Sequence, residues 1–114
     1  MSQPSGTDRS EVVVKQTEKQ FSDAVVELAT LLGWKVKRDP MWRATAASPG
    51  YPDLTMTNGK QIVFAELKVG KNVPTQPQRE WIALLRSVTS KYTDITVAVW
   101  TPDDWDDIEE ALKR

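Results

Sequence analysis

A run of apolar positions with helical spacing begins just after residue 16. Its members fall on one stripe of the predicted helix: Phe21, Val25, Leu28 and Leu32. Thr17 is followed three residues later by Gln20, the capping-box pattern typical of a helix start. Gly33 is expected to end the helix. The pattern therefore predicts one amphipathic helix from about residue 17 to residue 32.

Alternating or β-branched apolar positions predict four strands. They cover residues 34–38, 53–57, 61–69 and 95–100. Trp34 and Val36 share one face of the first strand. Asn58-Gly59 separates the second strand from the third, and this dipeptide favours a two-residue type I′ turn. The two central strands are thus expected to form a tight hairpin.

Two more helices are predicted in the second half of the chain. The first opens with a capping box from Thr75 to Gln78. Its expected inward positions are Trp81, Leu84, Leu85 and Val88. The last helix starts at Thr101-Pro102. Its expected inward positions are Trp105, Ile108 and Leu112.

These elements give the order α-β-β-β-α-β-α, which is typical of a small mixed α/β domain. With 114 residues, a single domain over residues 16–114 is expected, preceded by a flexible tail over residues 1–15. Residues 39–50 hold two prolines and small residues, and they are predicted to form a loop. The chain has no apolar run long enough to span a membrane and no signal-peptide pattern, so we expect a cytoplasmic protein.

Glu66 and Lys68 are anomalous, because they lie in the most apolar predicted strand. Counting outward from a two-residue turn pairs Thr57 with Lys60 and Asp53 with Phe64. Asp53 then shares a face with Glu66, as a diagonal neighbour at about 7–8 Å. The charges of Glu66 and Lys68 alone would be explained by an ion pair between them, or by side chains that reach solvent. Two carboxylates beside one lysine are explained most simply by a divalent cation between them.

Composition narrows the chemistry further. The chain has no cysteine and no histidine, which excludes Cys/His zinc sites, thiol catalysis and Ser-His-Asp triads. An enzyme with this composition must use carboxylates, lysine, hydroxyls or a hard metal ion. The net charge is −2 over residues 1–33, +6 over residues 34–93 and −5 over residues 94–114. The middle of the chain could therefore hold a polyanion, although scattered surface charges would give the same count.

Two helical residues are further candidates for the site. Glu18 lies at the start of the apolar stripe of the first helix. A glutamate in a first turn is also favoured by the helix dipole alone. Gln78 shares a face with Trp81, but its capping box is an equally good explanation.

"GYPDL" followed by "FAELK" resembles the Pro-Asp … (Asp/Glu)-X-Lys signature of the restriction-endonuclease-like, or PD-(D/E)XK, nuclease superfamily. With the "TEKQF" helix before it and the "QREW" helix after it, the chain looks most like a stand-alone virus-type replication-repair nuclease (VRR-NUC) domain, common in phages and bacteria. The resemblance covers about residues 16–112 and implies a restriction-endonuclease-like core, a mixed central sheet flanked by helices. For a phage-encoded protein, the resemblance implies that the protein is located in the cytoplasm of the host cell.

The resemblance also implies roles for individual residues. Asp53, Glu66 and the backbone carbonyl of Leu67 would bind Mg²⁺ or Mn²⁺, and Lys68 would orient or activate the attacking water. The helical glutamate of the family matches Glu18, which would be catalytic and a further metal ligand. Its helical glutamine matches Gln78, with Gln76 as the less favoured alternative. Mg²⁺ suits this set because it prefers oxygen ligands and takes one or two carboxylates plus phosphate.

Basic and aromatic side chains in the flanking loops are candidate DNA contacts. Arg38, Trp42 and Arg43 precede the motif, and Lys71 and Asn72 follow it. The basic side chains there could hold a phosphate backbone, and Trp42 could stack on an unpaired nucleobase. A Trp42 that is packed or merely exposed is the blander interpretation. The acidic segment 103–110 is interpreted as helix capping and solubility.

The favoured hypothesis is a divalent-metal-dependent DNA endonuclease that hydrolyses phosphodiester bonds, with flaps, branches or Holliday junctions in replication, repair or recombination as its candidate substrates. The alternative is a nuclease-fold module that binds DNA or supports assembly without turnover. A plain structural α/β protein is the third hypothesis. Cutting both strands would need two copies, so a symmetric homodimer is plausible on family analogy.

Overall fold

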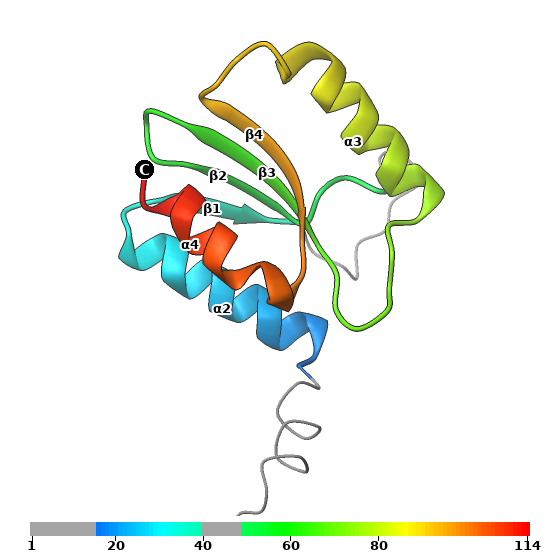
Figure 1. Cartoon of the computed structure of the whole chain (residues 1–114), viewed down its shortest axis with the longest axis horizontal. Coiled ribbons are helices and arrows are strands. Elements are labelled where there is room, and N and C mark those ends of the chain that lie inside the picture. Colours follow the sequence, from blue (N-terminus) through cyan, green and yellow to red (C-terminus); the bar gives the residue numbers. More distant parts are fainter. Residues whose placement is uncertain (1–15, 40–48) are drawn as a thin grey trace, which may run out of the picture.

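The structure, a computed structural model, describes residues 16–39 and 49–114. Its elements are α2 (Glu18–Leu31), β1 (Lys35–Arg38), β2 (Leu54–Thr57), β3 (Ile62–Leu67), α3 (Gln76–Thr89), β4 (Ile95–Trp100), the 3₁₀ turn η1 (Pro102–Asp104) and α4 (Trp105–Leu112). The predicted order α-β-β-β-α-β-α is confirmed (Figure 1). The predicted tail over residues 1–15 lies outside the described residues. None of the described helices has the length and apolar character needed to cross a membrane.

The four strands form one mixed sheet in the order β1-β2-β3-β4. β1 pairs with β2, and β2 with β3, in antiparallel orientation. β3 and β4 are parallel, so the chain must cross from one end of the sheet to the other between them, and α3 makes this crossover. The predicted fold class, a mixed α/β domain with helices flanking the sheet, is confirmed.

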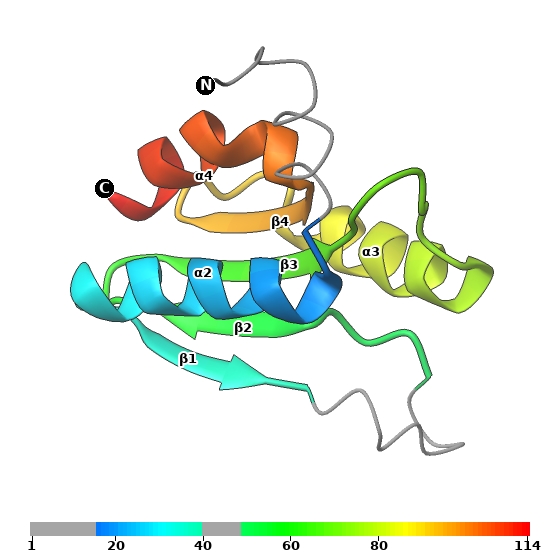
Figure 2. The ribbon, with the colours of Figure 1, turned by 90° about the horizontal axis from the view of Figure 1, so that it is seen from below.

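One face of the sheet carries the main core. α2 and α4 lie side by side against this face, whereas α3 lies along β4 on the other side (Figures 1 and 2). The buried core residues come from α2, the residue just before β1, the other strands and α4, and they are Phe21, Val25, Ala29, Trp34, Leu54, Met56, Val63, Ala65, Leu67, Trp100, Ile108 and Leu112. Trp34 Nε1 also donates a hydrogen bond of 2.8 Å to the carbonyl oxygen of Leu112, which joins the residue before β1 to the end of α4.

The predicted ends of α2 are confirmed. Thr17 Oγ1 accepts from Gln20 N at 3.0 Å, and Gln20 Oε1 accepts from Thr17 N at 2.9 Å. Gly33 has φ of 94°, a left-handed conformation that favours glycine after a helix. The prediction that Leu32 faces the core is wrong, because this side chain is exposed. The helix turns its Ala29 side toward the sheet instead.

The predicted two-residue hairpin turn is wrong. Thr57 pairs with Ile62 rather than with Lys60, so four residues form the connection. Asn58 Oδ1 accepts hydrogen bonds from Lys60 N at 2.9 Å and Gln61 N at 2.8 Å. These side-chain bonds close a longer loop, in which Gly59 still adopts φ of 89°.

The predicted inward stripe of α3 is also wrong in part. Leu84 is 67% exposed and Val88 is 63% exposed, whereas Ile82 is buried. The helix contacts the sheet mainly at β4, and Arg86 Nε and Nη2 both donate to the carbonyl oxygen of Val97 at 3.1 and 3.0 Å. Because α3 packs along one edge of the sheet, only its Ile82 side is covered.

Candidate metal and phosphate site

Asp53 and Glu66 lie next to each other at the end of the central hairpin. Leu54 pairs with Ala65, so the preceding residue, Asp53, falls opposite Glu66. The sequence count had placed Asp53 opposite Phe64, a difference of two residues. Side chains alternate faces with a period of two, so this error leaves Asp53 on the same face as Glu66. Directly opposed side chains are closer than the diagonal pair that the count predicted.

Asp53 is held in place by backbone contacts on both sides. Its Oδ2 accepts a hydrogen bond of 2.8 Å from Leu67 N, at the end of β3. Its own carbonyl oxygen accepts from Asp39 N at 2.8 Å, just beyond β1. The Asp53 carboxylate therefore has a fixed position relative to Leu67, whose carbonyl is a predicted metal ligand.

Glu66 is the most unusual residue of the site, because it is a carboxylate with only 1% of its surface exposed. Neither Oε1 nor Oε2 accepts a hydrogen bond. The Nζ atom of Lys68, itself largely buried, lies 3.4 Å from Oε2 and forms an ion pair. A buried carboxylate without hydrogen bonds costs several kcal/mol, roughly, unless further positive charge compensates it.

The electrostatics of the site are governed by burial and by repulsion between acids. Burial, and then the negative charge of Asp53, raise the pKa of Glu66 to about 7, although Lys68 opposes the shift. Burial also raises the pKa of Asp53, against the hydrogen bond from Leu67 N and the charge of Lys68. One lysine thus does not neutralise the two carboxylates.

Glu18 is electrostatically coupled to this pair. It lies in the first turn of α2, half-buried. Burial and then the charge of Asp53 raise the pKa of Glu18, and Lys68 lowers it. Glu18 in turn contributes to the raised pKa of Glu66. The structure therefore places the start of α2 beside the hairpin end.

Gln78 is engaged in the capping box of α3. Its Oε1 accepts from Thr75 N at 2.8 Å, and its N lies 3.4 Å from Thr75 Oγ1. Gln76, the alternative, donates from Nε2 to Glu80 Oε2 at 3.3 Å. Both glutamine side chains thus have structural partners within α3 or at its start.

The segment before Asp53 is fixed to α3 by Gly50 and Tyr51, which were not among the candidate site residues. A Cβ atom on Gly50, which has φ of 87°, would lie 2.5 Å from the carbonyl carbon of Pro77. The Tyr51 ring packs edge-on against Trp81, with the ring centroids 4.9 Å apart. The Gly-Tyr-Pro run before the aspartate was the available signal, because glycine permits this close approach of two backbones.

The candidate DNA contacts have different surroundings. Arg38 Nη1 lies 2.8 Å from Asp23 Oδ1 of α2, so its guanidinium is engaged on the face of the sheet that carries α2. Lys71 is exposed. Trp42 and Arg43 lie outside the described residues.

The donor set of the site fits a small divalent cation. The Glu66 oxygens lack hydrogen-bond partners, and Asp53 and Lys68 are the charges beside them. Within residues 16–39 and 49–114, no three acidic side chains are close enough together to bind a metal ion by themselves. The protein could offer Asp53, Glu66 and a backbone carbonyl, and Mg²⁺ commonly completes such a set with water or phosphate oxygens.

Comparisons with known proteins give a structural resemblance but no sequence family. No protein-family model and no curated protein matches the chain. Among solved structures, the chain is similar to Hjc, a Holliday junction resolvase from Archaeoglobus fulgidus, with 22% sequence identity and a TM-score of 0.45. The similarity covers 71% of this chain and 64% of the resolvase, so the chain spans less than two thirds of that protein.

Proposed function

We propose that this protein is a divalent-metal-dependent DNA endonuclease that hydrolyses phosphodiester bonds. The single observation that carries the proposal is the buried Glu66 carboxylate, which has no hydrogen bond and lies on the same face as Asp53, beside Lys68. Lys68 alone does not neutralise the two acids, and a bound divalent cation would supply the missing positive charge. The motif that these residues form resembles a nuclease signature.

The residues of the chain divide the work of hydrolysis between them. Asp53, Glu66 and the Leu67 carbonyl would hold Mg²⁺ or Mn²⁺, which supplies a more acidic water and offsets charge on the phosphate. Lys68 forms an ion pair with Glu66 and can stabilise the additional negative charge on the phosphate as it is attacked. The hydrogen bond from Leu67 N fixes the position of Asp53 before substrate arrives. We propose that Glu18 supports the site by its charge, and that Gln78 fixes the first turn of α3.

The substrate class is part of the proposal. Branched, flapped or four-way-junction DNA of replication, repair or recombination is the expected target. The basic middle of the chain supports DNA as the partner.

A cleavage panel tests the activity. The protein is incubated with flapped, single-stranded, duplex and four-way-junction DNA, with Mg²⁺, with Mn²⁺ or with chelator. Cleavage is expected only with a divalent cation, and Asp53→Asn and Glu66→Gln should each abolish it. Glu110→Gln removes an exposed acid from α4 and is the matched control. If no DNA is cut, or if both site variants cut as well as the parent, the proposal fails; salt-sensitive binding without cleavage would support the DNA-binding module instead.

We further propose that two copies associate, since one site cuts one strand at a time. The outer side of α3 supports this proposal, because Leu84 and Val88 form an exposed apolar pair one turn apart. Analytical ultracentrifugation should show a dimer that Leu84→Glu converts to a monomer. Lys113→Glu, at the exposed C-terminal end, should leave the dimer unchanged.

A further inference from the structure

Within residues 16–39 and 49–114, one face of the sheet is left uncovered over β1 and β2, and this face continues from the candidate site. Thr55 pairs with Phe64 and Thr57 with Ile62, so these side chains lie on the same face as Asp53 and Glu66. On the neighbouring strand, Lys37 pairs with Thr55 and shares this face. α2 and α4 cover the opposite face, whereas α3 packs mainly along β4. Among the residues that the structure describes, no helix covers the face over β1 and β2.

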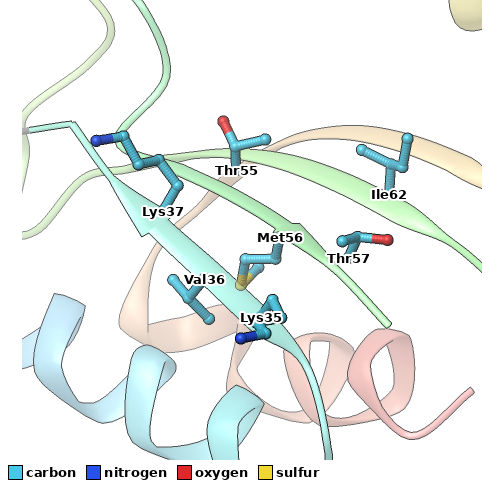
Figure 3. Close-up of a pocket in the computed structure, with 7 residues that line it drawn as sticks. All are labelled: Lys35, Val36, Lys37, Thr55, Met56, Thr57 and Ile62. Carbon is cyan, nitrogen blue, oxygen red and sulfur yellow. The ribbon is translucent and has the colours of Figure 1, made fainter. Parts of the chain in front are cut away.

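A hollow of about 350 Å³ lies on this uncovered face. It is lined by Lys35, Val36, Lys37, Thr55, Met56, Thr57 and Ile62. Figure 3 shows Lys37, Thr55 and Ile62 projecting away from the helices, while Val36 and Met56 point toward them. The hollow is thus lined on this face by Ile62, two threonines and two lysines. Its volume is in the range of pockets that hold small ligands, and it could accommodate one nucleobase.

The hollow and the candidate site are aligned along β3. Ile62 lies in the hollow, Phe64 comes next on the same face, and Glu66 follows. Four residues of an extended strand span about 13 Å. Phe64 is half-buried, so part of its ring is accessible between the two places. Along this face lie, in order, the hollow with its lysines, the half-buried Phe64 ring, and then the buried Glu66 carboxylate opposite the half-buried Asp53.

This combination matches the chemistry of an unpaired nucleic-acid strand. A single strand presents flat apolar base faces together with an anionic backbone, and proteins bind it with aromatic or apolar surfaces beside basic side chains. A duplex hides its bases and offers mainly phosphates. Lysines on an edge strand also discourage strand pairing between molecules, but this role needs no hollow beside them.

We infer that the uncovered face of β1, β2 and β3 binds an unpaired DNA strand adjacent to the phosphate that is cut. A base occupies the hollow against Ile62, and Lys37 contacts the backbone. This inference rests on the proposed nuclease function and narrows its substrates to DNA with a single-stranded arm. It also selects Lys37 over Arg38, because the register puts Arg38 on the face that carries α2, where it pairs with Asp23.

Fluorescence anisotropy tests the inference with two probes, a labelled oligothymidine and a blunt hairpin duplex. The protein carries Asp53→Asn in every case and no divalent cation is present, so neither probe is cut. Lys37→Glu should weaken binding of oligothymidine by about tenfold. Lys37→Ala should reduce the slope of log affinity against log salt by about 0.7. Ile62→Asp should weaken oligothymidine binding more than duplex binding. Lys113→Glu changes the same charge on a distant exposed residue and should have no effect beyond about twofold.

Thermal melting of each variant shows whether it is folded, and Lys37→Gln provides a milder change of the same residue. The inference would be overturned if the variants lost equal affinity for oligothymidine and for the duplex. It would also be overturned if Lys37→Glu bound oligothymidine as well as Lys113→Glu does. These results would leave the nuclease proposal intact if the parent protein cleaves DNA. A parent that neither binds nor cleaves any DNA would overturn the proposed function itself.

Discussion

Replacement of Glu66 by glutamine isolates the electrostatic cost of the site. Glutamine has nearly the same shape but no charge, so the variant keeps the packing of a side chain that is 1% exposed. In the parent, the pKa of Glu66 is raised from 4.5 to about 7. A difference of one pKa unit corresponds to about 1.4 kcal/mol, so ionising this buried group costs the fold on the order of 3 kcal/mol.

The sign of the pH dependence follows from the direction of the shift. Because the folded protein binds the Glu66 proton more tightly than the unfolded chain, this contribution to stability is fully present below pH 4.5. It is lost as the pH rises through about 7. The free energy of unfolding of the parent should therefore fall across this interval, and Glu66→Gln should lack this part of the decrease. The advantage of the variant should grow from near zero at pH 4.5 to about 3 kcal/mol at pH 8.

Urea denaturation followed by tryptophan fluorescence, in buffers with chelator from pH 4.5 to pH 8.5, measures this difference. Glu110→Gln is the control, because Glu110 is exposed on α4. Added Mg²⁺ should stabilise the parent at pH 8 but not Glu66→Gln, since a ligand that binds only the folded state raises its stability. Parallel pH profiles for the parent and Glu66→Gln would refute the reasoning about a buried, uncompensated carboxylate.

Two further replacements test how the structure is held together. Gly50→Ala should destabilise the protein by at least about 2 kcal/mol, because the new Cβ would lie 2.5 Å from the carbonyl carbon of Pro77. Gly59→Ala is the matched control for thermal melting: Gly59 also has a positive φ, but nothing lies within 4 Å of its added Cβ, so its cost should be nearer 1 kcal/mol. Similar losses for the two would contradict the close-approach argument. Trp34→Phe removes the buried hydrogen bond to the Leu112 carbonyl and should cost about 1–3 kcal/mol in urea denaturation, with little change in the far-ultraviolet circular dichroism spectrum. A neutral result would mean that this carbonyl finds another partner.

The order of the elements could be predicted from the sequence because the local signals were strong. Capping boxes at Thr17 and Thr75 set both helix starts, and the structure confirms them. The turn between β2 and β3 could not be predicted, because the loop length depends on hydrogen bonds from Asn58 Oδ1 to two backbone N–H groups. The Asn58-Gly59 dipeptide alone does not indicate those hydrogen bonds. The prediction that Asp53 and Glu66 share a face is still correct, because a register shift of two residues preserves the alternation of side chains.

The outward side of α3 shows a second limit of sequence reasoning. Leu84 and Ile82 both belong to apolar stripes with helical spacing, and the pattern alone favours the larger stripe. In the structure α3 covers only one edge of the sheet, and Ile82 rather than Leu84 is buried. How far a helix covers a sheet is a tertiary property, which depends on the crossover between β3 and β4.

The hydrogen bond from Leu67 N to Asp53 Oδ2 has a consequence for the way an inactive form of this protein should be made. The Asp53 side chain accepts from a backbone N–H at the end of β3, so it also completes the hairpin. Alanine would leave that N–H without a partner and loosen the strand end that carries Glu66. Asparagine keeps an oxygen acceptor while it removes the charge. A loss of function with alanine would therefore mix damage to the scaffold with loss of chemistry, whereas the asparagine form is the appropriate one for trapping an intact complex.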